Sequence, residues 1–169
     1  MTATFRAGDQ SDAVVLDQLY ETVFCDTFAH LYAPEDLNAF LASYGVDDWR
    51  GELADSSRAF RVAEVGGAIV GYAKLCPMKL PVETPRPALV LDQLYVVKQH
   101  HGAGIAVQLM DWVLAEARRR GAEEIYLTVF TENHRARRFY ERYGFDYVGP
   151  YRFMVGNHAD EDIIMRKAL

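Results

Sequence analysis

The chain has 169 residues, of which 50% are hydrophobic and 25% are charged. These are the proportions of an ordinary globular protein, so they exclude a disordered chain and a fibrous repeat and predict one domain over residues 1–169. The formal net charge of −6 would repel nucleic acid and anionic membranes, so we expect neither as a partner.

Cysteine and hydropathy patterns narrow the class further. Cys25 and Cys76 form no paired motif, and the five histidines show no metal-ligand spacing with them. The sequence therefore supports neither a disulfide framework nor a metal site, and no metal is expected. No apolar run approaches the ~20 residues needed to cross a bilayer. We expect a soluble, cytoplasmic protein.

The first third of the chain is predicted to be helical. Apolar residues recur every three or four positions, and Asp9 or Ser11 can cap the first helix. Pro34 begins a second helical pattern, which Gly45 should end. The predicted helices span residues 10–31, 34–44 and, less regularly, 48–53; the apolar face of the first comprises Val14, Val15, Leu19, Val23, Phe24, Phe28 and Leu31.

The period then changes to that of strands. Gly66 and Gly67 supply the positive-φ positions of a tight hairpin. Four prolines in residues 77–87 exclude an inner strand there. The predicted elements are strands over 60–65 and 69–75, a nearly continuous apolar strand over 88–97, a helix between Gly104 and Gly121, a strand over 125–130, a helix over 133–143, and strands over 145–153 and 163–166.

Residues 88–130 read as strand, glycine turn, helix and strand. This order predicts a right-handed crossover between parallel strands, with hairpins on both sides, so we expect a mixed α/β sheet. The amides of the Gly102–Gly104 turn and the positive end of the helix dipole converge where an anion could bind. The turn lacks a third glycine and a following Lys-Ser or Lys-Thr, which excludes a dinucleotide fingerprint and a P-loop.

The helix over 133–143 can be explained by structure alone, with Asn133 as N-cap and Gly144 as C-cap. Together with the glycine turn, however, it resembles the acetyl-CoA-binding half of the GCN5-related N-acetyltransferases (GNAT). That family's pattern is Asn-x-x-Ala-x-x-Phe-Tyr-x-x-x-Gly-Phe, and the matching residues are Asn133, Ala136, Phe139, Tyr140, Gly144 and Phe145.

The resemblance covers nearly the whole chain and implies a GNAT-type, mostly antiparallel sheet flanked by helices. Residues 91–96 and 125–129 look like the family's fourth and fifth strands, which splay apart to admit the pantetheine arm of acetyl-CoA. The family's diphosphate loop fits as Gln99-x-x-Gly102-x-Gly104 or, in the preferred register, as His101-x-x-Gly104-x-Ala106. The resemblance implies these cosubstrate-binding residues: Leu94, Tyr95, Val96, His101, Gly102, Ala103, Gly104, Ile105, Ala106, Asn133, Ala136 and Tyr140.

The resemblance also implies direct acetyl transfer, with Tyr140 protonating the departing thiolate and an amide of residues 94–96 as the oxyanion donor. An alkylamine must lose a proton before it attacks. Asp92, on the predicted fourth strand, is the best sequence candidate for a base or a water-relay anchor. Its low intrinsic pKa makes attraction of the substrate cation an equal alternative.

The acceptor is expected to be a small-molecule amine. The segments 21–28, 153–156 and 162–169 look like the bacterial spermidine/spermine N-acetyltransferase branch, which implies a polyamine. An acidic rim on the N-terminal helices would concentrate such a polycation: Glu21, Asp26, Glu35, Asp36, Asp47 and Asp48. The alternatives are an aminoglycoside, a protein N-terminus, or a non-catalytic acyl-CoA-binding regulator. Edge strands near the C-terminus are compatible with a homodimer.

Overall fold

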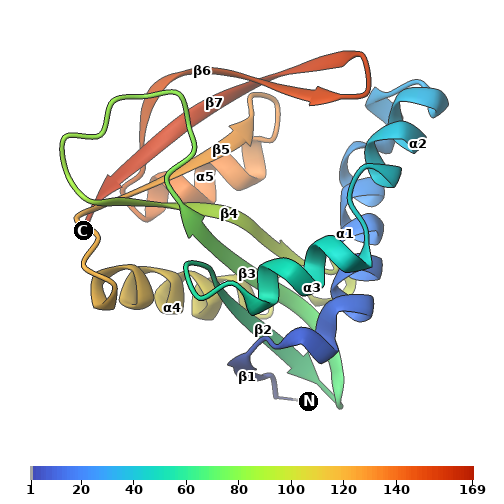
Figure 1. The fold of residues 1–169 in the computed structure, drawn as a ribbon, viewed down its shortest axis with the longest axis horizontal. Helices are drawn as coiled ribbons and strands as arrows, with labels where there is room; N and C mark the ends of the chain where they lie inside the picture. Colours follow the sequence, from blue (N-terminus) through green and yellow to red (C-terminus); the bar gives the residue numbers. More distant parts are fainter. Residues whose placement is uncertain (1) are drawn as a thin grey trace.

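The computed structural model describes residues 2–169. In this part of the chain a seven-stranded sheet, in the order β1-β2-β3-β4-β5-β7-β6, carries five α-helices (Figure 1). The strands are β1 (Thr4–Ala7), β2 (Ala59–Val65), β3 (Ala68–Pro77), β4 (Ala88–Val96), β5 (Glu124–Phe130), β6 (Asp146–Val155) and β7 (His158–Ala168). The α-helices are α1 (Ala13–Phe28), α2 (Pro34–Ala42), α3 (Val46–Ala54), α4 (Ile105–Arg119) and α5 (His134–Arg142), and short 3-10 turns are η1 (Gln10–Asp12), η2 (Ala29–Leu31) and η3 (Lys98–His100).

Alternating side chains of the strands contribute to a large core on each face of the sheet, and two smaller clusters add to these. Helix α4 buries Leu109, Met110 and Val113 against one face, and α5 packs on the same core. Helices α1 and α3 cover the other face, where Trp49 is fully buried beside Leu16. The predicted mixed α/β sheet with flanking helices is confirmed.

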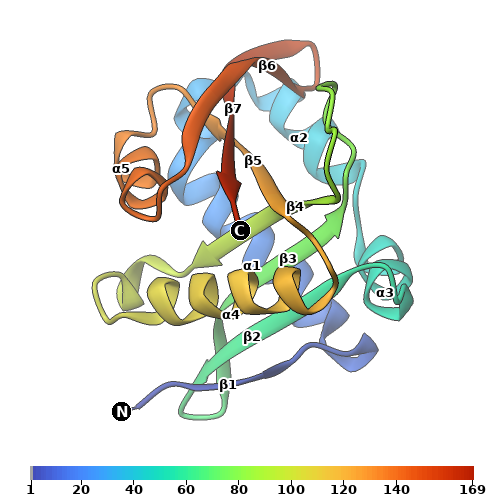
Figure 2. The same cartoon turned by 90° about the vertical axis from the view of Figure 1, so that its left-hand side faces the viewer.

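Strands β4 and β5 are parallel but pair over only three residues. Ala88–Val90 lies opposite Glu124–Tyr126, and beyond that point the strands diverge (Figure 2). The predicted crossover and the splay are therefore both present. Strand β4 also has a bulge at Asp92, because Lys74 pairs with Gln93 while Leu75 pairs with Leu91. An extra residue of this kind bends a strand and re-aims its side chains.

The first helix differs from its prediction. It is divided into η1, α1 and η2, and its buried face includes Leu16 and Tyr20, whereas Val14 and Val15 are 44% and 42% exposed. Spacings of three and four fit two adjacent faces of such an apolar helix, and packing on the sheet selects one. Asp9 is the cap, since its Oδ1 accepts the Ser11 N–H at 2.8 Å.

Two further differences concern the ends of the sheet. The four-residue strand β1 has no counterpart among the predicted strands, and Gly45 precedes α3 as its N-cap instead of closing α2. The last two strands extend to residues 155 and 158–168 and form one long hairpin turning at Gly156.

The tip of the β6–β7 hairpin touches α2, as Figure 1 shows. The Asn157 N–H donates to Asp36 Oδ1 at 2.9 Å. Gly156 has φ +57°, and a Cβ there would lie 2.6 Å from the same oxygen, so only glycine fits this contact. In residues 2–169, no helix combines the length and the apolar character that crossing a membrane requires.

Candidate active site

A cavity of about 390 Å³ opens where β4 and β5 diverge. Helix α1, the segment after η2, α5 and the β6–β7 hairpin complete its walls. The cavity is lined by these predicted site residues: Asp92, Leu94, Tyr95, Val96, His101, Ala106, Asn133, Ala136 and Tyr140. Residues from three separate segments, β4, the turn into α4, and α5 with its N-cap, thus meet in one place.

The free edge of β4 presents backbone donors to this cavity. The Val97 N–H donates to Val70 O on β3 at 2.9 Å, and donors alternate along an antiparallel strand. The Tyr95 amide is therefore directed at β3, while those of Leu94 and Val96 are directed at the side where β5 has moved away. Tyr95 contributes its ring, which stacks on Tyr20 with centroids 6.1 Å apart.

The glycine turn leads into α4, which begins at Ile105. Gly102 and Gly104 both have φ +80°, a conformation that glycine adopts readily. The amides of residues 102–106 donate to no group among the described residues, whereas the His101 amide donates to Lys98 O at 3.1 Å. The His101 amide is therefore not available to an anion, unlike the amides of residues 102–106. Of this turn, residues 102–105 do not line the cavity, and the Ile105 side chain is in the core.

The His101 ring is engaged by the protein itself. Its Nε2 lies 2.8 Å from Val96 O and its Nδ1 contacts Arg135 Nη1. Because a carbonyl only accepts, Nε2 carries the proton and Nδ1 accepts from the guanidinium. Arg135 is an exposed cation at the mouth of the cavity. The sequence analysis missed it, although it occupies a variable position of the Asn133 motif.

Helix α5 and its N-cap supply three of the predicted residues, Asn133, Ala136 and Tyr140. Asn133 is its N-cap, with Oδ1 accepting the Ala136 N–H at 3.3 Å. Tyr140 packs against Phe145, and its hydroxyl has no hydrogen-bond partner among residues 2–169. Burial raises the pKa of Tyr140 to about 12, so it is protonated at neutral pH. Tyr143 instead donates to Asp111 Oδ1 at 3.0 Å.

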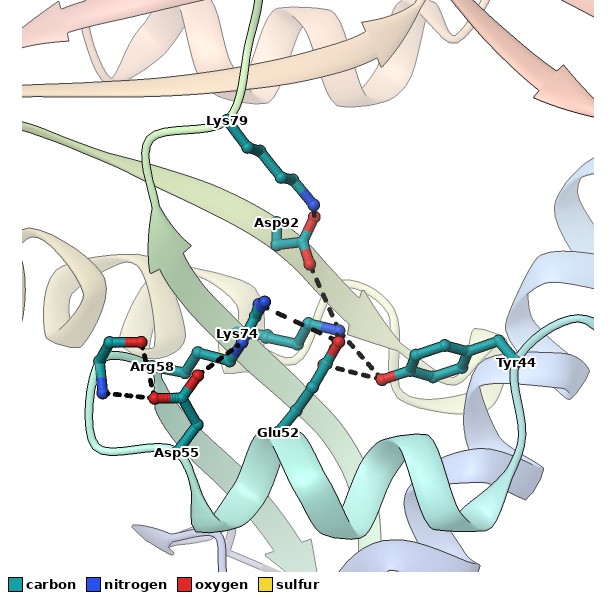
Figure 3. A network of polar contacts seen from close by, with 8 residues as sticks. Tyr44, Glu52, Asp55, Arg58, Lys74, Lys79 and Asp92 are labelled. Atoms are coloured by element: carbon teal, nitrogen blue, oxygen red, sulfur yellow. Dashed lines mark hydrogen bonds and ion pairs between the residues drawn. The ribbon is translucent and has the colours of Figure 1, made fainter.

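Asp92 lines the cavity but is held between two lysines (Figure 3). Its Oδ1 lies 2.6 Å from Lys79 Nζ and its Oδ2 lies 3.3 Å from Lys74 Nζ. Burial alone would raise the pKa of Asp92, but the two cations outweigh burial and lower the pKa below its usual value. The lysines also neutralise its charge. The pairing therefore argues against both roles expected for Asp92, base and cation attractor.

Lys74 connects the β4 bulge at Asp92 to α3. The lysine is 2% exposed, and its Nζ lies 2.5 Å from Glu52 Oε2, which also accepts the Tyr44 hydroxyl at 2.7 Å (Figure 3). The same Nζ lies 4.9 Å from the centroid of the Trp49 ring, within cation–π range. No spacing in the sequence points to this network, because its members come from α3, β3, β4 and the residues next to them.

The acids predicted on the N-terminal helices do not line this cavity. Several make local bonds: Asp36 with Asn157, Asp47 with Arg50, and Asp48 with the Gly45 amide. The cavity takes its other carboxylates, Asp160 and Asp162, from β7. The sequence analysis missed these two because it began the last strand at residue 163.

Asp160 and Asp162 differ in their partners. Asp160 accepts the Tyr32 hydroxyl and lies 3.2 Å from His158 Nε2. Asp162 is 8% exposed, and its Oδ1 has no hydrogen-bond partner among residues 2–169. Burial, together with the charge of Asp160, raises the pKa of Asp162 to about 7.

Comparisons with known proteins agree with this geometry. A profile of the acetyltransferase (GNAT) family matches residues 17–145. An uncharacterized N-acetyltransferase of Mycobacterium tuberculosis is 36% identical over 138 residues, covering 81% of this chain and 85% of the relative. An uncharacterized N-acetyltransferase of Lactobacillus delbrueckii is 28% identical over 148 residues, covering 86% of each chain.

Among solved structures, the PaiA N-acetyltransferase of Thermoplasma acidophilum in complex with coenzyme A superposes with a TM-score of 0.81 at 19% identity, covering 100% of both chains. At that identity the likeness concerns the fold. The resemblance to the spermidine/spermine branch receives no support from the two bacterial relatives. The family profile, the curated relatives and the splayed strands lead to one conclusion: the chain belongs to the GNAT family and is an N-acetyltransferase.

Proposed function

We propose that the protein transfers the acetyl group of acetyl-CoA directly to a primary amine. The observation that carries the proposal is the cavity between β4 and β5, into which the Leu94 and Val96 amides and Tyr140 are directed. Holding an amine and a thioester together there can contribute roughly 7 to 11 kcal/mol without a covalent enzyme intermediate.

The cosubstrate fits the residues that surround the cavity mouth. Five consecutive amides, those of residues 102–106, are unpaired at the start of α4, and the helix dipole favours an anion there. Arg135 adds an exposed cation beside them. These groups suit the diphosphate of coenzyme A, and α4 starting at Ile105 favours the register His101-x-x-Gly104-x-Ala106.

Two further requirements of acetyl transfer, stabilisation of the acyl oxygen and protonation of the thiolate, have groups on the cavity wall. Acetyl-CoA supplies the thioester, and the Leu94 and Val96 amides are placed to stabilise charge developing on an acyl oxygen, an effect of about 3 kcal/mol. The Tyr140 hydroxyl, free of internal partners, can give its proton to the thiolate.

The test is release of free coenzyme A, followed with a thiol reagent, from acetyl-CoA and a panel of primary amines. We expect amine-dependent release with acetylated product detected by mass spectrometry. Tight binding of acetyl-CoA without amine-dependent release would instead favour the acyl-CoA-binding regulator. The polyamine acceptor expected from the sequence and the homodimer are both untested, so the panel should include spermidine and spermine beside monoamines.

A further inference from the structure

Binding of acetyl-CoA gives no role to Asp162, a carboxylate on β7 that lines the cavity. Asp160 and Asp162 point to the same face of β7, because they are two residues apart, and both line the cavity. Phe130 on β5 and Tyr151 on β6 are paired directly with Asp162. Directly paired residues of antiparallel strands share a face, so aromatic rings flank Asp162 on both sides.

Asp162 lacks the hydrogen-bond or ion-pair partner that a buried carboxylate normally has. Asp160 is already satisfied by Tyr32 and His158, and Asp92 by Lys74 and Lys79. Asp162 is 8% exposed with an unpartnered Oδ1 among the described residues. An unpaired buried acid destabilises the fold, and such exceptions call for an explanation. A cation entering the cavity would supply the missing partner.

We propose that Asp162 binds the ammonium group of the acceptor and accepts its proton, a role that rests on the proposed acetyl transfer. The ammonium gives one proton to Asp162, and the free amine nitrogen bonds to the acyl carbon as the carbon–sulfur bond breaks. Tyr140 protonates the thiolate and is reprotonated by the second proton leaving the nitrogen. Asp162 then returns its proton to solvent, so atoms and charge balance.

The surroundings of Asp162 tune it for this exchange. The titratable groups that interact with it are Asp160 on β7, Tyr32 after η2 and Tyr95 on β4, and Tyr151 faces it from β6. None of them is a cation. Burial and the Asp160 charge therefore raise the pKa of Asp162 to about 7, where a general base works best at neutral pH.

The cavity also limits the charge of the acceptor. Asp162 is the single carboxylate of its lining without a partner among residues 2–169. A polyamine would bring second and third charges that find no free acid there. The walls around it are aromatic and suit an apolar body beside one cation: Phe24, Phe28, Tyr32, Phe130, Tyr151 and Phe153. The substrate class is a monocationic primary amine with an apolar or aromatic substituent.

The first experiment compares three variants by steady-state kinetics between pH 5.5 and 9. For the wild type, kcat with 2-phenylethylamine should rise with an apparent pKa near 7. Asp162→Asn should lower kcat at least about 100-fold and abolish this limb, leaving the Kd for acetyl-CoA unchanged. Asp160→Asn should move the limb to lower pH. Glu161→Gln, exposed on the outer face, is the matched control and should behave as wild type.

The outcomes distinguish a wrong assignment of Asp162 from a wrong assignment of acetyl transfer as the function. A wild type without turnover on any amine would overturn the proposed function itself. An Asp162→Asn variant within about threefold of an active wild type, or one that keeps the limb near pH 7, would overturn only the assignment of Asp162. A spermidine kcat/KM equal to or above that of 2-phenylethylamine would overturn the monocation class, for which we expect at least a tenfold preference.

A second measurement does not depend on turnover. Because the pKa of Asp162 is raised in the folded protein, its charge costs stability that increases as pH rises from about 4 to about 7. Asn removes that cost without changing the shape of the side chain. The Tm of Asp162→Asn should therefore exceed that of the wild type more at pH 8 than at pH 5. A variant with a lower Tm at pH 8 would show that Asp162 is stabilised by partners and contradict the proposal.

Discussion

Tyr140 and Tyr143 lie one turn apart on or next to α5, and their hydroxyls have different surroundings. The Tyr140 hydroxyl is free among the described residues, while that of Tyr143 is bonded to Asp111. Tyr140→Phe should therefore lower turnover by roughly 100-fold at an unchanged Kd for acetyl-CoA. Tyr143→Phe is the matched control, with turnover near that of the wild type. A binding defect with normal turnover in Tyr140→Phe would assign this residue to packing.

Lys74 holds the β4 bulge through two buried ion pairs. Lys74→Met would leave Glu52 and Asp92 without this cation and should lower the free energy of unfolding by about 3 kcal/mol. Urea denaturation measures this loss, and the exposed Lys98→Met variant should change it by less than about 0.5 kcal/mol. A loss below about 1 kcal/mol in Lys74→Met would mean that the network contributes specificity and little stability.

The sequence predicted several residues that line the cavity but not which contacts they make with the rest of the protein. Motif spacing placed Tyr140, Asn133 and His101 on one cavity, because their positions follow from helix caps and the glycine turn. It could not foresee that His101 would bond to Val96 or that Lys74 would neutralise Asp92. Those contacts join strands and helices whose relative placement is set only by tertiary packing.

The turn between β4 and α4 combines two effects of glycine. At φ +80° a β-branched residue at position 104 is strained by roughly 1–2 kcal/mol, and its side chain would crowd an anion at the free amides. Gly104→Val should therefore raise the Kd for acetyl-CoA at least tenfold, or about 1.4 kcal/mol. Isothermal titration calorimetry measures this change.

Gly67→Val is the matched control for the turn. Gly67 has φ +81° and equally open surroundings, but it lies in the β2–β3 hairpin and does not line the cavity. It should carry a similar strain and leave the Kd unchanged. If both variants bind acetyl-CoA like the wild type, the α4 amides do not hold the diphosphate.

Elements bounded by strong local signals were predicted well. Glycines and prolines marked the β2–β3 hairpin, the loop before β4 and both ends of α4. Strand β1 is only four residues long, and the start of β7 carries Asp160, Glu161 and Asp162. Acidic residues are depleted in strands, so no strand signal precedes residue 163 and the predicted strand lacks the segment that provides the cavity with its unpaired acid.

Across the molecule, the two edges of the sheet are β1 and β6, and β6 leaves Tyr147 and Met154 more than half exposed. A homodimer through β6 stays a prediction that light scattering can test.

The mixed sheet and the family were predictable because the crossover and its glycine turn are local in sequence. The site for the acceptor amine could not be predicted in this way, because its walls come from segments far apart in the sequence, namely α1, β5 and the β6–β7 hairpin.

The divergence of β4 from β5 gives neighbouring amides of one strand different lifetimes in deuterated water. Tyr95 and Val97 donate to β3, on the side away from the cavity, while Leu94 and Val96 face the gap. In the free protein we expect slow hydrogen exchange at 95 and 97 and fast exchange at 94 and 96; acetyl-CoA should slow only the latter pair. Uniform protection along β4 before ligand is added would contradict this alternation. The exchange rates of the Leu94 and Val96 amides, compared with those of Tyr95 and Val97, would thus measure how long acetyl-CoA stays bound between β4 and β5.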